Sequence, residues 1–191
     1  MQKKWDLRYK DTDISLASPA KVLAENTHLL PNSGNALDLA CGSGGNAIFL
    51  TRHGLNTDAF DNSAVIIRKL STYAEQQKLT LSAQILNVET EQLPANYYDV
   101  IVVSYFLERS IFPNILSALK AGGLLYYQTW SQESASTNGP SSTRFRLERG
   151  ELLKLCPDLE LVLYREEGTI GNSQKGFRDE VFYIGKKSDS F

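Results

Sequence analysis

A glycine-rich turn between an apolar run and a helix-like segment is the strongest constraint on the fold of this chain. The apolar run Leu37 to Cys41 passes directly into the turn, Gly42 to Ala47. Gly42 and Gly44 allow backbone dihedrals that are barred to residues with a Cβ, and they let a ligand approach the backbone closely. The first N–H groups of the following helix have no partner within the helix. The pattern therefore predicts a strand, turn and helix that bind a nucleoside or amino-acid cofactor.

Apolar runs and helix-like segments alternate along the chain, which is typical of a parallel sheet covered on both faces. Apolar residues recur at helical spacing in Gly45 to His53, Ser63 to Lys78 and Phe112 to Ala121. The segment Glu166 to Asp179 contains glycines but no amphipathic helix, so we expect the last two strands to form an antiparallel hairpin at the sheet edge. The predicted strands are Ala36 to Ala40, Asn56 to Asp61, Leu81 to Asn87, Tyr98 to Ser104, Gly123 to Trp130, Leu159 to Arg165 and Glu180 to Lys186.

Length and composition limit the classes of function. A chain of 191 residues accommodates one buried core but not two ordinary catalytic domains, so we expect a single domain over residues 1–191, with an N-terminal cap segment (1–30) and a candidate substrate-side loop (131–147). Its 20 Lys and Arg nearly balance its 22 Asp and Glu, which argues against a nucleic-acid substrate. No apolar run approaches the roughly 20 residues of a membrane span and the start lacks the pattern of a signal peptide, so a cytoplasmic protein without membrane attachment is expected. Two cysteines and two histidines favour neither a disulfide framework nor a metal site.

Two aspartates narrow the class of cofactor. Asp38 lies just before the glycines, where a carboxylate suits the cationic amino group of a methionine moiety and repels a pyrophosphate. Asp61 ends the next strand, 23 positions later, near the offset of about 20 residues at which such folds hold a ribose diol. The turn also satisfies the dinucleotide fingerprint, so a nicotinamide oxidoreductase stays open as the weakest hypothesis.

With these motifs the chain resembles the class I S-adenosylmethionine-dependent methyltransferases, and among them the tellurite-resistance type and its small relatives. The resemblance implies an α/β fold, a Rossmann-like three-layer sandwich whose seven-stranded, mostly parallel sheet has the order 3-2-1-4-5-7-6 with strand 7 antiparallel. It also implies S-adenosylmethionine as cofactor and S-adenosylhomocysteine as product. The segments that carry it are Trp5 to Tyr9, Asp38 to Ala47, Asp61 to Ser63, Asn87 to Glu89, Ser104 to Arg109 and Leu119 to Gly123.

The resemblance also assigns roles within the cofactor site. The glycine-rich turn and the end of the fourth strand are expected at the methionine end, Asp61 at the ribose hydroxyls, and Asn62, Asn87 and Val88 at the adenine. The N-terminal segment is expected to fold over the cofactor. The cofactor-binding residues implied in this way are Trp5, Arg8, Tyr9, Asp38, Ala40, Gly42, Gly44, Asn46, Asp61, Asn62, Asn87, Val88 and Ser104.

Three positions depart from the family pattern. Ala40 replaces the first glycine of the commonest motif, and Gly45 stands where arginine is frequent. Glu108 stands where relatives of this type often have a histidine beside Arg109, which removes a base that titrates near neutral pH. The acceptor of this chain is therefore expected to differ from that of better-known relatives.

Methyl transfer from a sulfonium is an in-line displacement, so the protein mainly has to align the acceptor about 3 Å from the methyl carbon and exclude water. A protic acceptor also needs a base. Tyr105, Glu108 and Arg109 are the expected catalytic residues near the donor sulfur. Arg109 is either an anchor for an anionic substrate or a solvated surface charge, and Glu108 is either a base or a solvated carboxylate.

The sequence thus favours methyl transfer to a small-molecule acceptor, such as a soft nucleophile or an oxyanion. The alternative from another class is a non-catalytic S-adenosylmethionine-binding regulatory module. The sequence leaves open whether the protein is a monomer or a homodimer.

Overall fold

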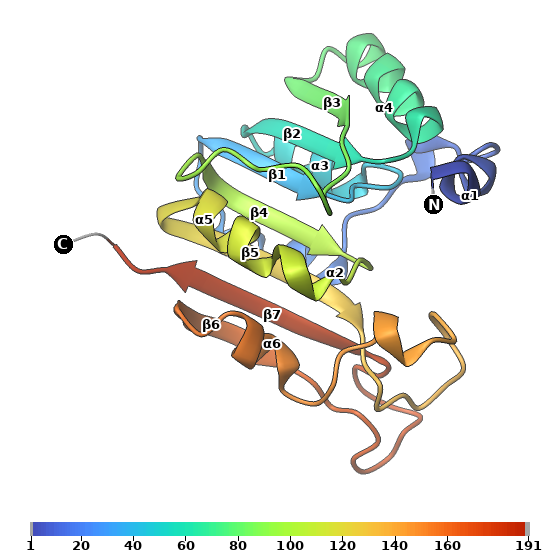
Figure 1. Ribbon diagram of the computed structural model, residues 1–191, viewed down its shortest axis with the longest axis vertical. Helices are drawn as coiled ribbons and strands as arrows, with labels where there is room; N and C mark the ends of the chain where they lie inside the picture. The colour runs from blue at the N-terminus through green and yellow to red at the C-terminus, as the bar shows by residue number, and fades with distance from the viewer. Residues whose placement is uncertain (1, 190–191) are drawn as a thin grey trace.

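The computed structural model describes residues 2–189 and contains a seven-stranded sheet with the order β3-β2-β1-β4-β5-β7-β6 (Figure 1). Neighbouring strands run parallel except β7, which is antiparallel to both β5 and β6. The α/β fold, the strand order and the antiparallel terminal pair predicted from the sequence are confirmed. The strands are β1 (Asn35–Leu39), β2 (Asn56–Asp61), β3 (Leu81–Ile85), β4 (Tyr98–Ser104), β5 (Leu119–Trp130), β6 (Leu159–Arg165) and β7 (Glu180–Lys187).

Helices cover both faces of this sheet. Apolar side chains of α2, α3 and α4 pack on one face, and those of α5 and α6 pack on the other. A further helix, α1, lies beside α4 at the end of the molecule toward which β1 and β4 point (Figure 1). None of the helices described within residues 2–189 has the length and apolar character needed to span a bilayer. The helices are α1 (Gln2–Arg8), α2 (Lys21–Ala24), α3 (Gly45–Arg52), α4 (Ala64–Gln76), α5 (Phe112–Ala118) and α6 (Glu151–Leu155).

Some element boundaries differ from those predicted. β5 begins at Leu119 rather than Gly123 because the side chain of Leu119 is buried and its backbone pairs with Tyr98, so α5 ends at Ala118. β3 ends two residues early because the side-chain oxygen of Asn87 accepts from the backbone N–H of Glu89 and turns the chain. The short helices α1, α2 and α6 were not predicted, since none is long enough to show an amphipathic period.

The β1–α3 connection contains three left-handed residues that alternate with ordinary ones. Ala40, Gly42 and Gly44 have φ values of 56°, 50° and 77°, so the backbone reverses within five residues and leads into the buried start of α3. At Ala40 the left-handed conformation costs about 1 kcal/mol relative to glycine, which is the residue of the commonest family pattern. The next residue, Gly45, has ordinary helical dihedrals but no room for a side chain, because a Cβ there would overlap the backbone of Ser18. Residues 18–20 cross directly over Gly45, and this tight crossing explains why arginine does not occupy the position.

Substitution of Gly45 tests this crossing. We expect Gly45→Ala to lower the free energy of unfolding by about 2–3 kcal/mol, because a methyl group must displace backbone rather than a flexible side chain. The matched control is Gly171→Ala, where a Cβ meets open space and only the left-handed φ of 70° is unfavourable, at about 1 kcal/mol. Urea unfolding of the two variants measures the difference, and equal losses would contradict the tight crossing.

Candidate functional site

Most of the predicted site residues meet at the carboxyl edge of the parallel strands. Leu39 at the end of β1 pairs with Phe60 of β2 and Val103 of β4, so the residues that follow these three strands emerge side by side. The glycine-rich turn, Asp61 with Asn62, and Ser104 with Tyr105 therefore share one edge. The loop after β5 and the start of β7 lie at the same edge (Figure 1).

Asp38 is a fully buried carboxyl group at this edge. Its Oδ2 accepts a 3.0 Å hydrogen bond from the backbone N–H of Ala47, and its Oδ1 accepts a 3.2 Å bond from Nδ2 of Asn46. Burial raises the pKa of Asp38 to about 7, although these two hydrogen bonds oppose the rise. Both partners are neutral, so neither of them offsets a charge on this carboxylate.

Asn46 connects Asp38 to neighbouring elements. Its Nδ2 also donates to Oγ of Ser104 at 2.9 Å, and its Oδ1 accepts from the backbone N–H of Ala20 at 2.8 Å. The side chain is buried and all of its polar atoms have protein partners. Asn46 therefore positions Asp38 and Ser104, and its predicted role as a direct cofactor ligand requires one of these bonds to be exchanged.

Asp61 lies against the same turn from the neighbouring strand. Its Oδ2 accepts from the backbone N–H of Gly42 at 3.0 Å, and its Oδ1 accepts from that of Ser63 at 2.9 Å. Burial raises the pKa of Asp61, and the backbone hydrogen bonds partly offset this effect. Asp38 and Asp61 are thus both held by backbone N–H groups at the carboxyl edge of the sheet.

The N-terminal segment packs over this turn. The hydroxyl oxygen of Tyr9 would lie 3.0 Å from a Cβ on Gly42, and Asp6 accepts a 2.6 Å hydrogen bond from Oγ of Ser63. Trp5 stacks on Tyr9 with ring centroids 5.9 Å apart, and the exposed Arg8 lies over the Trp5 ring at 5.3 Å. Their expected contacts with a cofactor stay a prediction.

Asn87 and Val88 lie on the chain beyond the end of β3. Asn87 is exposed, whereas the side chain of Val88 is buried in the core cluster beneath α5. Their expected role at an adenine ring stays a prediction, and only the backbone and the outer edge of Val88 are suited to it.

The predicted catalytic residues Glu108 and Arg109 both have internal partners. Arg109 donates from Nε and Nη2 to the carboxylate of Glu151 at 2.5 and 3.0 Å, and it also donates to the carbonyl oxygens of Arg144 and Arg146 at 2.7 and 3.1 Å. Glu108 accepts from Ser110 and from Arg144. Burial raises the pKa of Glu108, but these hydrogen bonds outweigh it and the net pKa is below the ordinary value. In this arrangement Arg109 ties the 131–147 loop to α6, and Glu108 is a weak base.

Two polar side chains at the same edge, those of Gln128 and Glu180, were not predicted from the sequence. Gln128 is buried within β5 and pairs in register with Ser104, and its Nε2 donates to the hydroxyl of Tyr105 at 2.9 Å and to Glu180 at 2.5 Å. The one available signal was a glutamine inside an otherwise apolar run, which marks a buried polar group but does not identify its partners.

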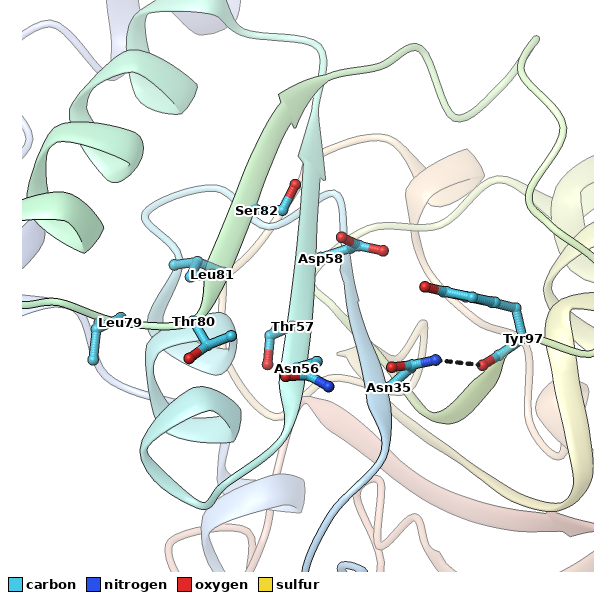
Figure 2. A pocket seen from close by; sticks show the side chains of 9 residues that line it. All are labelled: Asn35, Asn56, Thr57, Asp58, Leu79, Thr80, Leu81, Ser82 and Tyr97. Atoms are coloured by element: carbon cyan, nitrogen blue, oxygen red, sulfur yellow. Dashed lines mark hydrogen bonds between the residues drawn. The ribbon is translucent and has the colours of Figure 1, made fainter.

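A separate pocket lies at the opposite edge, where β1, β2 and β3 begin (Figure 2). Asn35 donates to the carbonyl of Tyr97 across this pocket at 3.4 Å, and none of the predicted site residues lines it. Its lining consists of Asn35, Asn56, Thr57, Asp58, Leu79, Thr80, Leu81, Ser82 and Tyr97.

Comparison with known families gives a match over most of the chain. Residues 7–179 match the family model described as tellurite resistance protein TehB. A ubiquinone biosynthesis O-methyltransferase of Coxiella burnetii is 26% identical over 130 residues, which cover 65% of this chain and 56% of that protein. A probable S-adenosyl-L-methionine-dependent methyltransferase TehB of Haemophilus influenzae is 28% identical over 137 residues, which cover 68% of this chain and 47% of that protein. The chain spans about half the length of these curated relatives.

Solved structures share the fold. The crystal structure of TehB from Haemophilus influenzae superposes with a TM-score of 0.73 at 21% identity, covering 98% of this chain and 67% of that one. A methyltransferase structure from Methanosarcina mazei gives a TM-score of 0.69 at 18% identity, covering 91% of this chain and 100% of that one. The fold is therefore the Rossmann-like fold of S-adenosylmethionine-dependent methyltransferases.

The contacts of Arg109 predict a stabilising role at the base of the 131–147 loop. We expect Arg109→Gln to speed hydrogen exchange about tenfold at the amides of Gln132 and Leu147, which bond across that base, because hydrogen bonds to a charged group stabilise by about 1.5–3 kcal/mol. The matched control is Arg149→Gln, which removes an exposed ion pair with Glu133 in the same loop and should change exchange little. Unchanged exchange in Arg109→Gln would contradict the role.

Proposed function

The chain belongs to the tellurite resistance protein TehB family, and from this premise we propose that it is a methyltransferase that transfers the methyl group of S-adenosylmethionine to a small-molecule acceptor. The observation that carries the proposal is the buried carboxyl group of Asp38 beside the left-handed turn, with Asp61 on the other side of the same turn. One carboxylate without a cationic partner suits an amino-acid ammonium group, and the other suits a ribose diol.

The cofactor's methionine end would lie against Asp38, Ser104 and the turn. Asp38 would attract the ammonium group, since its present partners are the neutral groups of Asn46 and Ala47. The left-handed Gly42 would keep the turn free of a side chain next to the ligand, whereas Gly44 leaves room for the buried Leu70. When bound, the sulfonium supplies an electrophilic methyl group, and this chain's part is to orient it and exclude water.

The ribose and adenine would lie toward β2 and β3. Asp61 holds two backbone N–H groups and retains lone pairs for two ribose hydroxyls. Asn62 follows it directly, and Tyr9 and Trp5 cover the turn from the N-terminal side. Asp38 also disfavours the pyrophosphate of a nicotinamide dinucleotide at this turn, which argues against the oxidoreductase hypothesis.

The acceptor is proposed to be a small molecule, and the contacts of two arginines bear on its charge. An oxyanion needs a free cation, and the guanidinium groups of Arg109 and Arg146 are both committed to protein oxygens. This pairing removes these two arginines as anchors for an oxyanion acceptor. The names of the methyltransferase relatives also favour an enzyme over a non-catalytic regulatory module.

Calorimetric titration of S-adenosylhomocysteine tests the proposed cofactor site. We expect the wild-type protein to bind, and Asp61→Ala to bind about tenfold to a hundredfold more weakly, because two hydrogen bonds to a charged group are lost. The matched control is Asp58→Ala on the same strand, whose carboxylate accepts from Tyr98 near the opposite edge, and it should retain wild-type affinity. Failure of the wild type to bind, or tighter binding of a nicotinamide dinucleotide, would contradict the proposal.

A further inference from the structure

A cluster of polar and aromatic side chains lies beside Ser104, where β4 and β5 end and β7 begins. It is formed by Tyr105, Gln128, Trp130 and Glu180. Gln128 Nε2 donates to both the Tyr105 hydroxyl and Glu180 Oε2, and the Tyr105 hydroxyl donates to Glu180 at 3.2 Å. The rings of Tyr105 and Trp130 are 5.4 Å apart between centroids. Oε1 of Glu180 has only a 3.4 Å contact with Tyr105, so it retains capacity for another donor.

This cluster is built next to the proposed methionine end. Ser104 and Gln128 are register partners in β4 and β5, and Ser104 receives a hydrogen bond from the same Asn46 amide that holds Asp38. On its other side, Oε1 of Gln128 accepts from the backbone N–H of Val22 at 2.9 Å. The cluster is therefore tied to the sheet and to the N-terminal segment by buried bonds, while the Tyr105 side chain is 49% exposed.

Backbone strain at Tyr105 supports a role for this side chain. Tyr105 has a φ of 55°, although it is neither glycine nor asparagine, and its N–H donates to the carbonyl oxygen of Gln128 at 2.8 Å. A left-handed tyrosine costs about 1–2 kcal/mol, and such residues concentrate at functional sites. The strained conformation directs the ring toward Glu180 and Trp130.

The carboxylate of Glu180 has charged neighbours of both signs. Within residues 2–189 its carboxylate makes no ion pair, and burial raises its pKa. Lys21 is the nearby attractive charge, whereas Asp179 repels and is itself bonded to Ser134, Ala135 and Ser136. A carboxylate beside two aromatic rings attracts a cationic or strongly donating group and disfavours an anion.

We propose that the acceptor is an amine, held at the rings of Tyr105 and Trp130, and that Glu180 is the catalytic residue that accepts its proton. This inference rests on the proposed methyltransferase function and names its substrate class. Glu180 first takes a proton from the bound ammonium group, which leaves a neutral amine with a free lone pair. The amine nitrogen then attacks the methyl carbon, and a C–N bond forms as the C–S bond breaks. The electron pair of the C–S bond goes to sulfur, which gives S-adenosylhomocysteine. The proton on Glu180 then passes to water, and the product leaves as the methylated ammonium ion.

Binding and turnover of primary amines test the proposal in the full chain. Butylamine and phenethylamine are titrated into protein saturated with S-adenosylhomocysteine, and methyl transfer to the same amines is followed with S-adenosylmethionine. We expect Glu180→Gln to weaken amine binding about tenfold and to lower kcat about a hundredfold, which is the lower range for loss of a general base. Its affinity for S-adenosylhomocysteine should stay within twofold of the wild type.

Matched variants separate charge from folding. Glu160→Gln makes the same change on β6 near the opposite edge of the sheet and should leave amine binding and turnover unchanged. Glu180→Asp keeps the charge and should recover part of the turnover. The proposal is overturned if neither amine binds to the loaded wild type, if Glu180→Gln binds and turns over amines normally, or if tellurite is methylated in preference to both amines. Loss of S-adenosylhomocysteine binding by the wild type would instead overturn the proposed function itself.

Discussion

The buried carboxyl group of Asp38 is the interaction on which the rest of the site depends. It lies near the carboxyl end of strand β1, and the first turn of α3 is bonded to it through the N–H of Ala47 and the amide of Asn46. The same asparagine fastens Ser104 of β4 and the backbone of Ala20, so one acidic group organises two strands, a helix and the N-terminal segment. The left-handed turn from Ala40 to Gly44 is what allows α3 to start within reach of it.

This arrangement has a cost in the ligand-free protein. Because burial raises the pKa of Asp38 from 3.8 to about 7, the folded state binds a proton more tightly than the unfolded chain does. The contribution of this group to stability is therefore present below pH 4 and declines as the pH rises through 7. The left-handed Ala40 and Tyr105 add strain at the same edge. Buried carboxyls and strained residues thus gather where the sheet is proposed to bind its cofactor and acceptor, which is typical of functional sites.

Patterns local in the sequence predicted most of the fold and part of the site. The apolar runs and glycines predicted the seven strands, and parallel pairing then implied that residues after β1, β2 and β4 share an edge. The partners of Arg109 could not be predicted, because Glu151 is 42 residues away in the sequence. The identity of a residue as arginine does not indicate whether its guanidinium is free or paired. Glu180 was missed for a similar reason, since its bond to Gln128 joins residues 52 apart and depends on the antiparallel register of β5 and β7.

Calorimetry of S-adenosylhomocysteine binding between pH 5.5 and 8 tests the central claim most directly, with buffers of different ionisation enthalpy to count released protons. If the ammonium group pairs with Asp38, the proton that the free protein holds below about pH 7 must leave on binding. The account predicts that affinity weakens by up to about tenfold per pH unit below pH 7, with up to one proton released through this group, and levels off above it. An affinity that is constant across this range, with no proton released, would contradict it.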